Sequence, residues 1–391
     1  MYNLLSDEEA RIIDFFHTMH AHPELSNEEF ETTAHIKAFL STLSHVELLP
    51  IATPTGVLAK IEGPHPGPTI GLRCDIDAIA QTEKYPCEFQ SVYPGKMHAC
   101  GHDFHTAALL GAAQILNRRY DELKGTAVLL FQCAEETTTG ADSMIRGGLF
   151  ELTHPDMFFG LHNWPLIPVG KVICKEGALM AAKTNFGITI HGRGGHGSMP
   201  HLNVDPIVCA ASAIMSLQTV LSRNIDPFEP VVLSINAIEG GSFDNLVVDS
   251  VRIAATIRTL STDAMARAKT RMEKLIHDTC AAYECTATIV YHDNIPLTFN
   301  SQPMYKLAVK AAARVVDNSD IITVEPTMAS EDFAKIMANV PSFMYWFGSG
   351  TSGVENHALH DPYFHVDEQG IKTASEVLAS SVFTAQETRT D

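Results

Sequence analysis

The chain has 391 residues, of which 45% are apolar and 19% are charged, a composition typical of globular rather than disordered proteins. Its length exceeds what a single hydrophobic core usually holds, so we expect two domains. The formal net charge of -19 gives an acidic surface that repels phosphate backbones. We therefore expect no nucleic-acid partner.

The eight cysteines are scattered through the chain without the spacing of a disulfide framework, and we expect free thiols. The first residues, MYNLLSDEEARIIDFF, lack the basic and apolar regions of a secretory signal. We find no run of about 18 apolar residues that would predict a membrane span. These features favour a reducing, cytoplasmic location and no membrane partner.

The first part of the chain alternates between helical and strand patterns. We expect helices at 6–16, 27–43 and 104–117. Short apolar strands are expected in GVLAKIEG, PTIGLRCDID, GTAVLLFQCAEE and MFFGLHNW. This alternation predicts an α/β fold with a mostly parallel sheet between two layers of helices.

The pattern changes near residue 183, where the predicted order becomes strand, helix, strand, strand, helix, strand. That order is the ferredoxin-like α+β pattern. We expect residues 183–292 to form an inserted domain. Residues 1–182 and 293–391 would then form one larger, discontinuous domain.

Acidic or histidine side chains follow three of the predicted strands. They are Asp75, Asp77, Glu135, Glu136 and His162. In open α/β sheets the functional crevice lies outside the carboxyl ends of the strands, so these side chains should converge. The segment MHACGHDFH (97–105) enters the 104–117 helix from the same edge.

Each part of this pattern also has an ordinary structural explanation. A histidine at a strand end, a glutamate pair in a loop or a single C-x-H spacing is by itself weak support for a metal site. Their convergence favours metal-assisted hydrolysis, in which two divalent ions activate a water and a non-ligand glutamate moves its proton. Adjacent glutamates can divide this labour because neighbouring side chains on a strand point to opposite sides.

The sequence resembles the M20 metallopeptidases, in the branch of hippurate hydrolases, N-acyl-amino-acid amidohydrolases and auxin-conjugate hydrolases. The similar stretches appear in family order over nearly the whole chain. They are HAHPELSNEE, LRCDIDAIA, PGKMHACGHDFHTAALLGAA, FQCAEE, GADSMIRGGL, GLHNWPLIPVGKV, GRGGHGSMPH, VVDSVRIAATIRTL, SEDFA and ALHDPYFHVDE.

The resemblance implies two divalent ions (zinc, manganese, cobalt or nickel) in the larger domain and an inserted lid domain that forms a homodimer. The residues at metal-binding positions are Cys100, His102, Glu136, His162 and His360. Glu135 matches the general base and Asp77 an acid that orients the site. His196 matches a histidine that holds the substrate carbonyl, and Asn245 and Arg258 match substrate-facing lid positions.

The implied reaction splits the amide bond of an N-acyl amino acid, such as an N-acetyl, N-benzoyl or aryl-acetyl conjugate. Its products are a carboxylate and a free amino acid. Three alternatives stay open: a dipeptidase or carboxypeptidase of the same clan, an amidase with Cys100 as nucleophile, and a non-catalytic protein that binds a metal or ligand.

Several residues near the metal-binding positions have other expected roles. We expect Asp103 to cap the following helix or to support the ligands from behind, and His98 and His105 to be structural or supporting. The chain departs from the family pattern at Ile79-Ala80, at Cys133 and in the TTTGAD loop. These departures leave the substrate preference open.

Overall fold

The protein is described here from a computed structural model that covers residues 2–242 and 244–388. The chain divides into two compact units. The larger unit comprises Met1–Gly177, Phe299–Glu325 and Asp332–Asp391, and the inserted unit comprises Ala178–Thr298 and Pro326–Glu331. The domain boundaries expected at 183 and 292 remain a prediction. By contacts between residues, the inserted unit begins at Ala178 and its main segment ends at Thr298.

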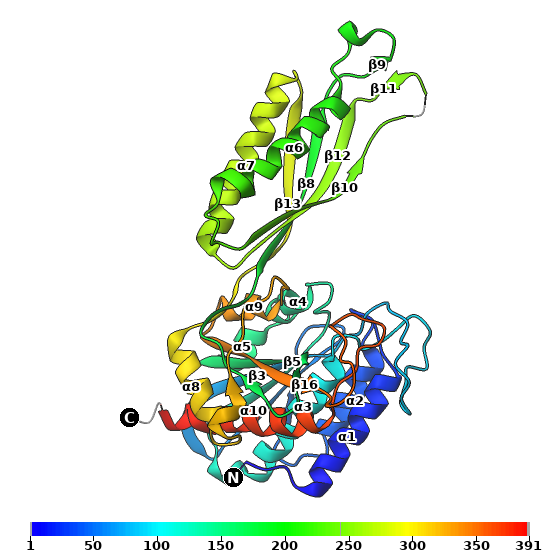
Figure 1. Ribbon diagram of the computed structural model, residues 1–391. Helices are drawn as coiled ribbons and strands as arrows, with labels where there is room; N and C mark the ends of the chain where they lie inside the picture. Colours follow the sequence, from blue (N-terminus) through cyan, green and yellow to red (C-terminus); the bar gives the residue numbers. More distant parts are fainter. Residues whose placement is uncertain (1, 243, 389–391) are drawn as a thin grey trace. The chain divides into compact units, whose positions relative to one another are not determined.

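The larger unit contains an eight-stranded mixed sheet in the order β1-β2-β4-β3-β5-β16-β6-β15 (Figure 1). The central strands β4, β3, β5 and β16 run parallel, whereas β1, β2 and β6 make antiparallel pairs. The strands are β1 Glu47–Leu49, β2 Val57–Glu62, β3 His65–Asp75, β4 Lys124–Gln132, β5 Met157–Pro168, β6 Val172–Ile173, β15 Ile321–Ile322 and β16 Ser342–Gly350. The α/β fold class is confirmed, with the parallel part at the centre of the sheet.

Helices cover both faces of this sheet. Figure 1 shows α1, α3, α8 and α10 on one face and α4 and α9 on the other. The helices are α1 Ser6–Ala21, α2 Phe30–Leu40, α3 His102–Arg118, α4 Gly140–Arg146, α5 Leu149–Thr153, α8 Gln302–Ala312, α9 Phe333–Met337 and α10 Gln369–Thr388, with short 3-10 turns at Tyr120–Glu122 and Asn318–Asp320.

Helix α3 is the central helix of the larger unit, and residues 102–116 are all buried. Its sequence is rich in small residues, which lets neighbouring helices approach closely. A Cβ on Gly111 would lie 2.2 Å from the Ser375 hydroxyl of α10, so only glycine fits at this contact. This packing fixes the first turn of α3, which carries His102.

The inserted unit has the order β8-α6-β10-β12-α7-β13, which confirms the expected ferredoxin-like arrangement. Its antiparallel sheet has the strand order β10-β12-β8-β13. The elements are β8 Ala182–His191, α6 Pro206–Asn224, β10 Val231–Glu239, β12 Ser250–Thr259, α7 Thr262–Ala282 and β13 Thr286–Ile295, with β9 Gly195–His196 paired to β11 Leu246–Val247 and a 3-10 turn at Pro200–Leu202. β7 Gly177–Met180 and β14 Thr298–Asn300 lie where the chain passes between the units.

Side-chain caps define where the two helices of the inserted unit begin. The Asp205 carboxylate accepts a hydrogen bond from the Ile207 amide, and Pro206 occupies the first helical position of α6. The Ser261 hydroxyl accepts from the Ala264 amide at the start of α7. Both helices then pack their apolar faces on the sheet, because the buried positions of α6 and α7 belong to one core cluster with β8 and β12.

Helix α6 meets the length and composition of a membrane span, although polar residues such as Ser212 and Gln218 interrupt its apolar sequence. Pro206–Asn224 is long and apolar enough by length and composition to cross a membrane, with a mean hydropathy of 1.2. Such a helix is weak support for a membrane span, because core helices of soluble proteins meet the same criteria. In this chain α6 is amphipathic, since Cys209, Ala213 and Leu217 are buried while Met215 is exposed.

Candidate active site

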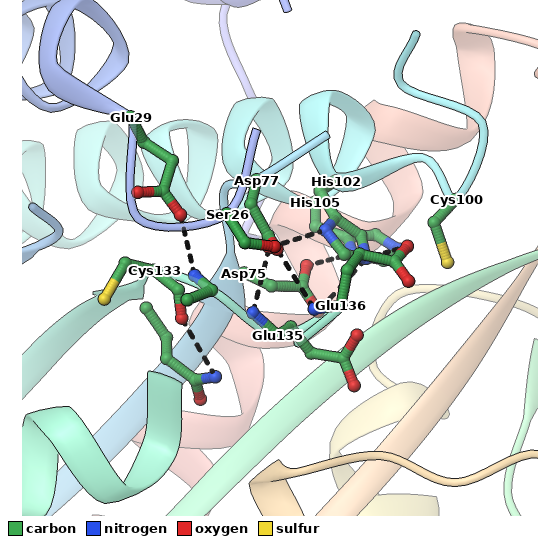
Figure 2. Close-up of polar contacts among 12 residues, drawn as sticks. Ser26, Glu29, Asp75, Asp77, Cys100, His102, His105, Cys133, Glu135 and Glu136 are labelled. Carbon is green, nitrogen blue, oxygen red and sulfur yellow. Dashed lines mark hydrogen bonds and ion pairs between the residues drawn. The ribbon is translucent and has the colours of Figure 1, made fainter. Parts of the chain in front are cut away.

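Several predicted site residues gather at one edge of the sheet of the larger unit, and Figure 2 shows Asp77, Cys100, His102, Glu135 and Glu136 there. Asp75 is the last residue of β3, and Glu135 and Glu136 follow the end of β4. His162 differs slightly from the expectation, because β5 continues past it to Pro168. Cys100 and His102 lie at the start of α3, so several separate segments contribute to one cluster.

Potential metal ligands in this cluster lie within reach of shared ions. Cys100 Sγ lies 3.5 Å from His162 Nε2, and Glu136 Oε1 lies 3.1 Å from His360 Nε2. Three groups have all their ligand atoms within 4.8 Å of one another: Cys100–His102–His162, Cys100–Glu136–His360 and His102–Glu135–Glu136. Cys100, His102 and Glu136 each occur in two of these groups, so neighbouring groups share ligands.

His102 and His162 present the same ring nitrogen, Nε2, to the other donors. His102 Nδ1 lies 3.1 Å from Asp77 Oδ1, and His162 Nδ1 lies 2.7 Å from the Asn163 carbonyl oxygen. These partners accept the Nδ1 proton, which leaves Nε2 for an ion. Burial opposes a charged His102, but the neighbouring Asp75 and Cys100 outweigh it and raise its pKa, so an ion must compete with a proton.

Unpaired buried atoms show that the residues present fit divalent ions. His102 Nε2 is buried without a hydrogen-bond partner, and Glu136 Oε1, although 3.1 Å from His360 Nε2, makes no hydrogen bond of good geometry. Buried polar atoms rarely lack one, and an ion would satisfy both. The donor set of one thiol, three imidazoles and carboxylates suits zinc, cobalt, nickel or manganese.

Asp77 supports this cluster from behind. Its carboxylate accepts hydrogen bonds from the Ser26 hydroxyl at 2.6 Å, the Glu135 amide at 3.1 Å and the Glu136 amide at 3.0 Å, in addition to His102. Burial alone would raise the pKa of Asp77, but the bonds to His102 and Ser26 outweigh burial and lower it. Asp77 therefore remains a carboxylate that fixes both glutamates and one histidine.

Glu29 is a supporting residue that the sequence analysis missed. Its fully buried carboxylate accepts from the Ala134 amide at 2.7 Å and from the Thr55 hydroxyl at 2.7 Å. Ala134 has a φ of 51°, a left-handed conformation that is unfavourable for a residue with a Cβ. Figure 2 shows this bond one residue before Glu135. The only sign of this role in the sequence was the acidic pair in SNEEF (26–30), and acidic residues are common at the start of any helix.

Asp332 is a second missed residue, in the segment SEDFA. Its amide donates to Glu135 Oε1 at 3.3 Å. Its carboxylate accepts from the Ala141 amide at 2.9 Å and from the Arg73 guanidinium at 3.2 Å. Arg73 is fully buried in β3, and an arginine inside the apolar strand TIGLRCDID was the signal for this network.

Three further residues of the segment 97–105 are buried beside the proposed ligands. His105 Nδ1 lies 2.5 Å from Asp75 Oδ1, and its Nε2 accepts from the Asn163 amide at 2.7 Å, so both nitrogens are engaged. His98 is buried, and burial lowers its pKa to about 4. Asp103 does not cap α3, because the helix begins at His102 after Gly101, whose φ of 86° suits glycine.

The predicted residues of the inserted unit form separate local contacts. His196, on β9, lies with its Nδ1 2.9 Å from the Ser198 hydroxyl and 3.3 Å from the Asn245 amide nitrogen. Arg258, on β12, donates to the Met328 carbonyl at 2.8 Å and to the Ser330 hydroxyl. The structure thus brings His196 and Asn245 together within this unit, while Arg258 is held by the segment at 328–330.

The thiol of Cys100 does not have the properties of an activated nucleophile. Burial, together with the negative charge of Glu136, raises the pKa of Cys100 well above its usual value. A reactive cysteine needs a lowered pKa and solvent access. A bound divalent ion would instead stabilise the thiolate, which favours Cys100 as a ligand.

The geometry agrees with a family assignment. The model of the peptidase family M20/M25/M40 matches residues 71–384. The match covers most of the chain, and the protein belongs to this family of hydrolases.

Characterised relatives and solved structures extend over nearly the whole chain. It is 41% identical to an N-acetyl-L-cysteine deacetylase of Bacillus subtilis (96% of this chain, 88% of the relative). It is 35% identical to an N-acetyldiaminopimelate deacetylase of Bacillus cytotoxicus (94% and 96%). A solved Bacillus subtilis protein described as a dinuclear metal binding peptidase from the M20 family has a TM-score of 0.85 and 34% identity over 98% of this chain and 99% of its own. This likeness supports two divalent ions.

Proposed function

We propose that the protein is a metal-dependent amidohydrolase that releases a carboxylate and a free amino acid from N-acyl amino acids. The observation that carries the proposal is the set of ligand groups sharing Cys100 and Glu136, with Glu135 beside them. Two relatives are named as deacetylases of N-acetylated amino acids, which favours acetyl as the acyl group.

In this reaction Glu135 moves the proton. When bound, the two divalent ions would lower the pKa of the attacking water and polarise the acyl carbonyl. Glu135 accepts a proton from the attacking water and passes it to the amine nitrogen as the amide bond breaks. Figure 2 shows the carboxylates of Glu135 and Glu136 diverging from adjacent backbone positions, which separates the base from the ligand.

Two neighbours keep this base in position. The Asp332 amide donates to Glu135 Oε1, which restricts the rotation of the carboxylate. Asp77 holds the Glu135 amide and orients His102. Holding a base in a fixed orientation lowers the entropic cost of reaching the transition state.

The inserted unit contributes the remaining substrate contacts of the proposal. His196 donates to the oxyanion that forms on the acyl carbon, and the bonded Asn245 keeps its ring oriented. Arg258 provides a positive charge for the substrate carboxylate. Its pKa is lowered by burial, which reflects partial removal of the guanidinium from water.

The finer features of the enzyme are also proposals. Zinc or manganese is the proposed metal, because the donors combine sulfur, nitrogen and oxygen. A cytoplasmic location is supported by eight free cysteines. A homodimer formed through the inserted unit is supported by the exposed apolar residues Ile207, Val208 and Met215 on α6. Light scattering that gives the mass of one chain would reject the dimer.

A substrate panel tests the proposed function. Purified protein is incubated with N-acetyl, N-benzoyl and indole-acetyl amino acids and with dipeptides, and free amino acid is measured. We expect metal-dependent release from N-acetyl amino acids that is lost after chelation and restored by added metal. Release that persists after complete chelation would reject the metal mechanism, and release from dipeptides alone would assign the chain to the peptidase alternative.

A further inference from the structure

A second cluster of potential ligands lies outside the catalytic site. His20 of α1 meets Glu83 and Cys87, two residues of a loop that has neither helix nor strand. His20 Nε2 lies 3.1 Å from Glu83 Oε1, and Cys87 Sγ lies 3.8 Å from the same oxygen. The ligand atoms of all three residues lie within 4.8 Å of one another.

These separations match the edges of a tetrahedral zinc site. Metal–ligand bonds of about 2.0–2.3 Å place neighbouring ligand atoms roughly 3.3–3.8 Å apart. The two separations in the cluster, 3.1 Å from His20 Nε2 and 3.8 Å from Cys87 Sγ to Glu83 Oε1, fall close to that range. In the absence of an ion, the Cys87 thiol donates a hydrogen bond to the same Glu83 oxygen that His20 Nε2 faces, so three potential ligand atoms already converge on one point.

The His20 ring is oriented in the same way as the catalytic histidines. His20 Nδ1 lies 2.6 Å from Asp103 Oδ2, a buried carboxylate that accepts the Nδ1 proton. Nε2 is thereby directed at Glu83 and Cys87. A carboxylate behind a histidine is a common support for a metal ligand, as Asp77 is for His102.

A histidine with one unpartnered ring nitrogen lines the cavity next to this cluster. The cavity, of about 30 Å³, is lined by His20, Glu83, Cys87 and His365, among others. His365 is 7% exposed, and its Nε2 is buried without a hydrogen-bond partner. Its Nδ1 lies 3.2 Å from the Tyr363 carbonyl, so Nε2 is the acceptor nitrogen. A cavity of this size holds one water.

We propose that His20, Glu83 and Cys87 bind one divalent ion of the zinc type, with a water in the fourth position that donates to His365 Nε2. Binding releases two protons, one from the Cys87 thiol and one from between His20 Nε2 and Glu83, so zinc uptake weakens as the pH falls. The ion would attach the loop that contains Glu83 and Cys87 to α1. It would be a further ion, separate from those of the hydrolytic site.

Metal stoichiometry tests the site directly. Wild-type protein, C87S and the control C174A are equilibrated at equal free Zn²⁺, desalted and analysed for zinc per chain. Cys174 is buried in the apolar core of the larger unit, outside this cluster. We expect C87S to hold one zinc fewer than wild type and C174A to hold the same number, with turnover unchanged in C87S. Equal zinc in wild type and C87S would overturn the proposal.

Thiol alkylation tests the site in the unmodified chain. Cys87 is the one cysteine of the eight that is partly exposed, and the other seven are buried. We expect Zn²⁺ to slow iodoacetamide modification of Cys87 at least tenfold, as measured by peptide mass. A modification rate at Cys87 that does not depend on Zn²⁺ would overturn the proposal, and neither result depends on whether the chain hydrolyses N-acyl amino acids.

Discussion

At the residue scale, two buried carboxylates hold three consecutive amides of the segment that carries both glutamates. Glu29 accepts from Ala134, and Asp77 accepts from Glu135 and Glu136. A left-handed alanine costs of order 1–2 kcal/mol. The bond from Glu29 offsets this cost, so that Glu29 positions the catalytic pair without touching the reacting atoms.

Substitutions of Glu29 test this role. E29M removes the acceptor for the Ala134 amide, and we expect kcat to fall about 10–100-fold, the usual effect of losing an outer support of a metal site. E29Q keeps one amide oxygen that can accept from Ala134, so kcat should stay near the wild-type value. Steady-state kinetics and metal analysis on folded protein provide the comparison.

Thr55 supplies the matched control for Glu29. T55V removes the other hydrogen bond to the Glu29 carboxylate and leaves the bond to Ala134. We expect nearly unchanged kcat in T55V. Equal kcat in E29M and T55V would contradict a positioning role for Glu29.

At this scale, a functional residue can be predicted from the sequence only when it belongs to a short local motif. Most of the proposed ligands stand in short motifs near strand ends or at the start of α3, so their convergence could be predicted, whereas His360 came from the family resemblance. Glu29 and Asp332 act on backbone amides 105 and 191 residues away along the chain, at Ala134 and Ala141. No local pattern contains such a pair, and neither role was predicted.

At the element scale, β3 is anchored by a buried cation. Arg73 donates to Asp75 at 3.0 Å, to Asp332 at 3.2 Å and to Gln132 at 2.9 Å. Removing one partner of a buried ion pair leaves uncompensated charges, which is strongly destabilising. This network joins the end of β3 to the segment that begins α9.

Substitution of Arg73 tests the strength of this anchor. We expect R73M to lower the free energy of unfolding of the larger unit by about 3–5 kcal/mol. K60M on β2 removes ion pairs to the exposed Glu47 and Glu62, so it should cost less than about 1 kcal/mol. Denaturant unfolding measures the free energy of unfolding of both variants. A similar loss of stability in R73M and K60M would contradict the role of Arg73 as an anchor.

Helix α10 contains a buried acid whose protonation is linked to stability. Glu376 accepts from the Leu4 amide at 3.0 Å, and burial raises its pKa above the usual 4.5. The folded state therefore binds the proton more tightly than the unfolded state. The contribution to stability is greatest below pH 4.5 and is lost as the pH rises through the higher folded pKa.

The variant E376Q tests this linkage. Glutamine keeps an acceptor for the Leu4 amide and does not ionise. We expect E376Q to unfold at a higher temperature than wild type at pH 7, with the advantage shrinking as the pH is lowered toward 4.5. An advantage that grows on acidification would show that the sign is wrong.

Most elements were predicted because apolar periodicity is a local property. The helix expected at 104–117 occurs as α3 at His102–Arg118, and the expected 27–43 helix is the shorter α2, Phe30–Leu40. Antiparallel pairing of β1, β2 and β6 was not predicted. Strand direction depends on where the chain returns to the sheet, and short strands carry no sign of it.

At the scale of the whole molecule, the chain consists of a larger unit and an inserted unit. The β-α-β-β-α-β order was predicted from alternating apolar patterns in one continuous segment. The inclusion of Pro326–Glu331 in the inserted unit was not predicted. This short segment is placed by contacts such as the Arg258 bond to the Met328 carbonyl, which join residues 70 positions apart.

The first measurement is the turnover of Glu135→Gln together with its metal content, with an N-acetyl amino acid as substrate. The variant keeps the size of the side chain and removes the carboxylate that accepts the proton. We predict metal content equal to wild type and kcat lower by about 10²–10⁴-fold. Turnover within tenfold of wild type at full metal content would contradict the assignment of Glu135 as the base.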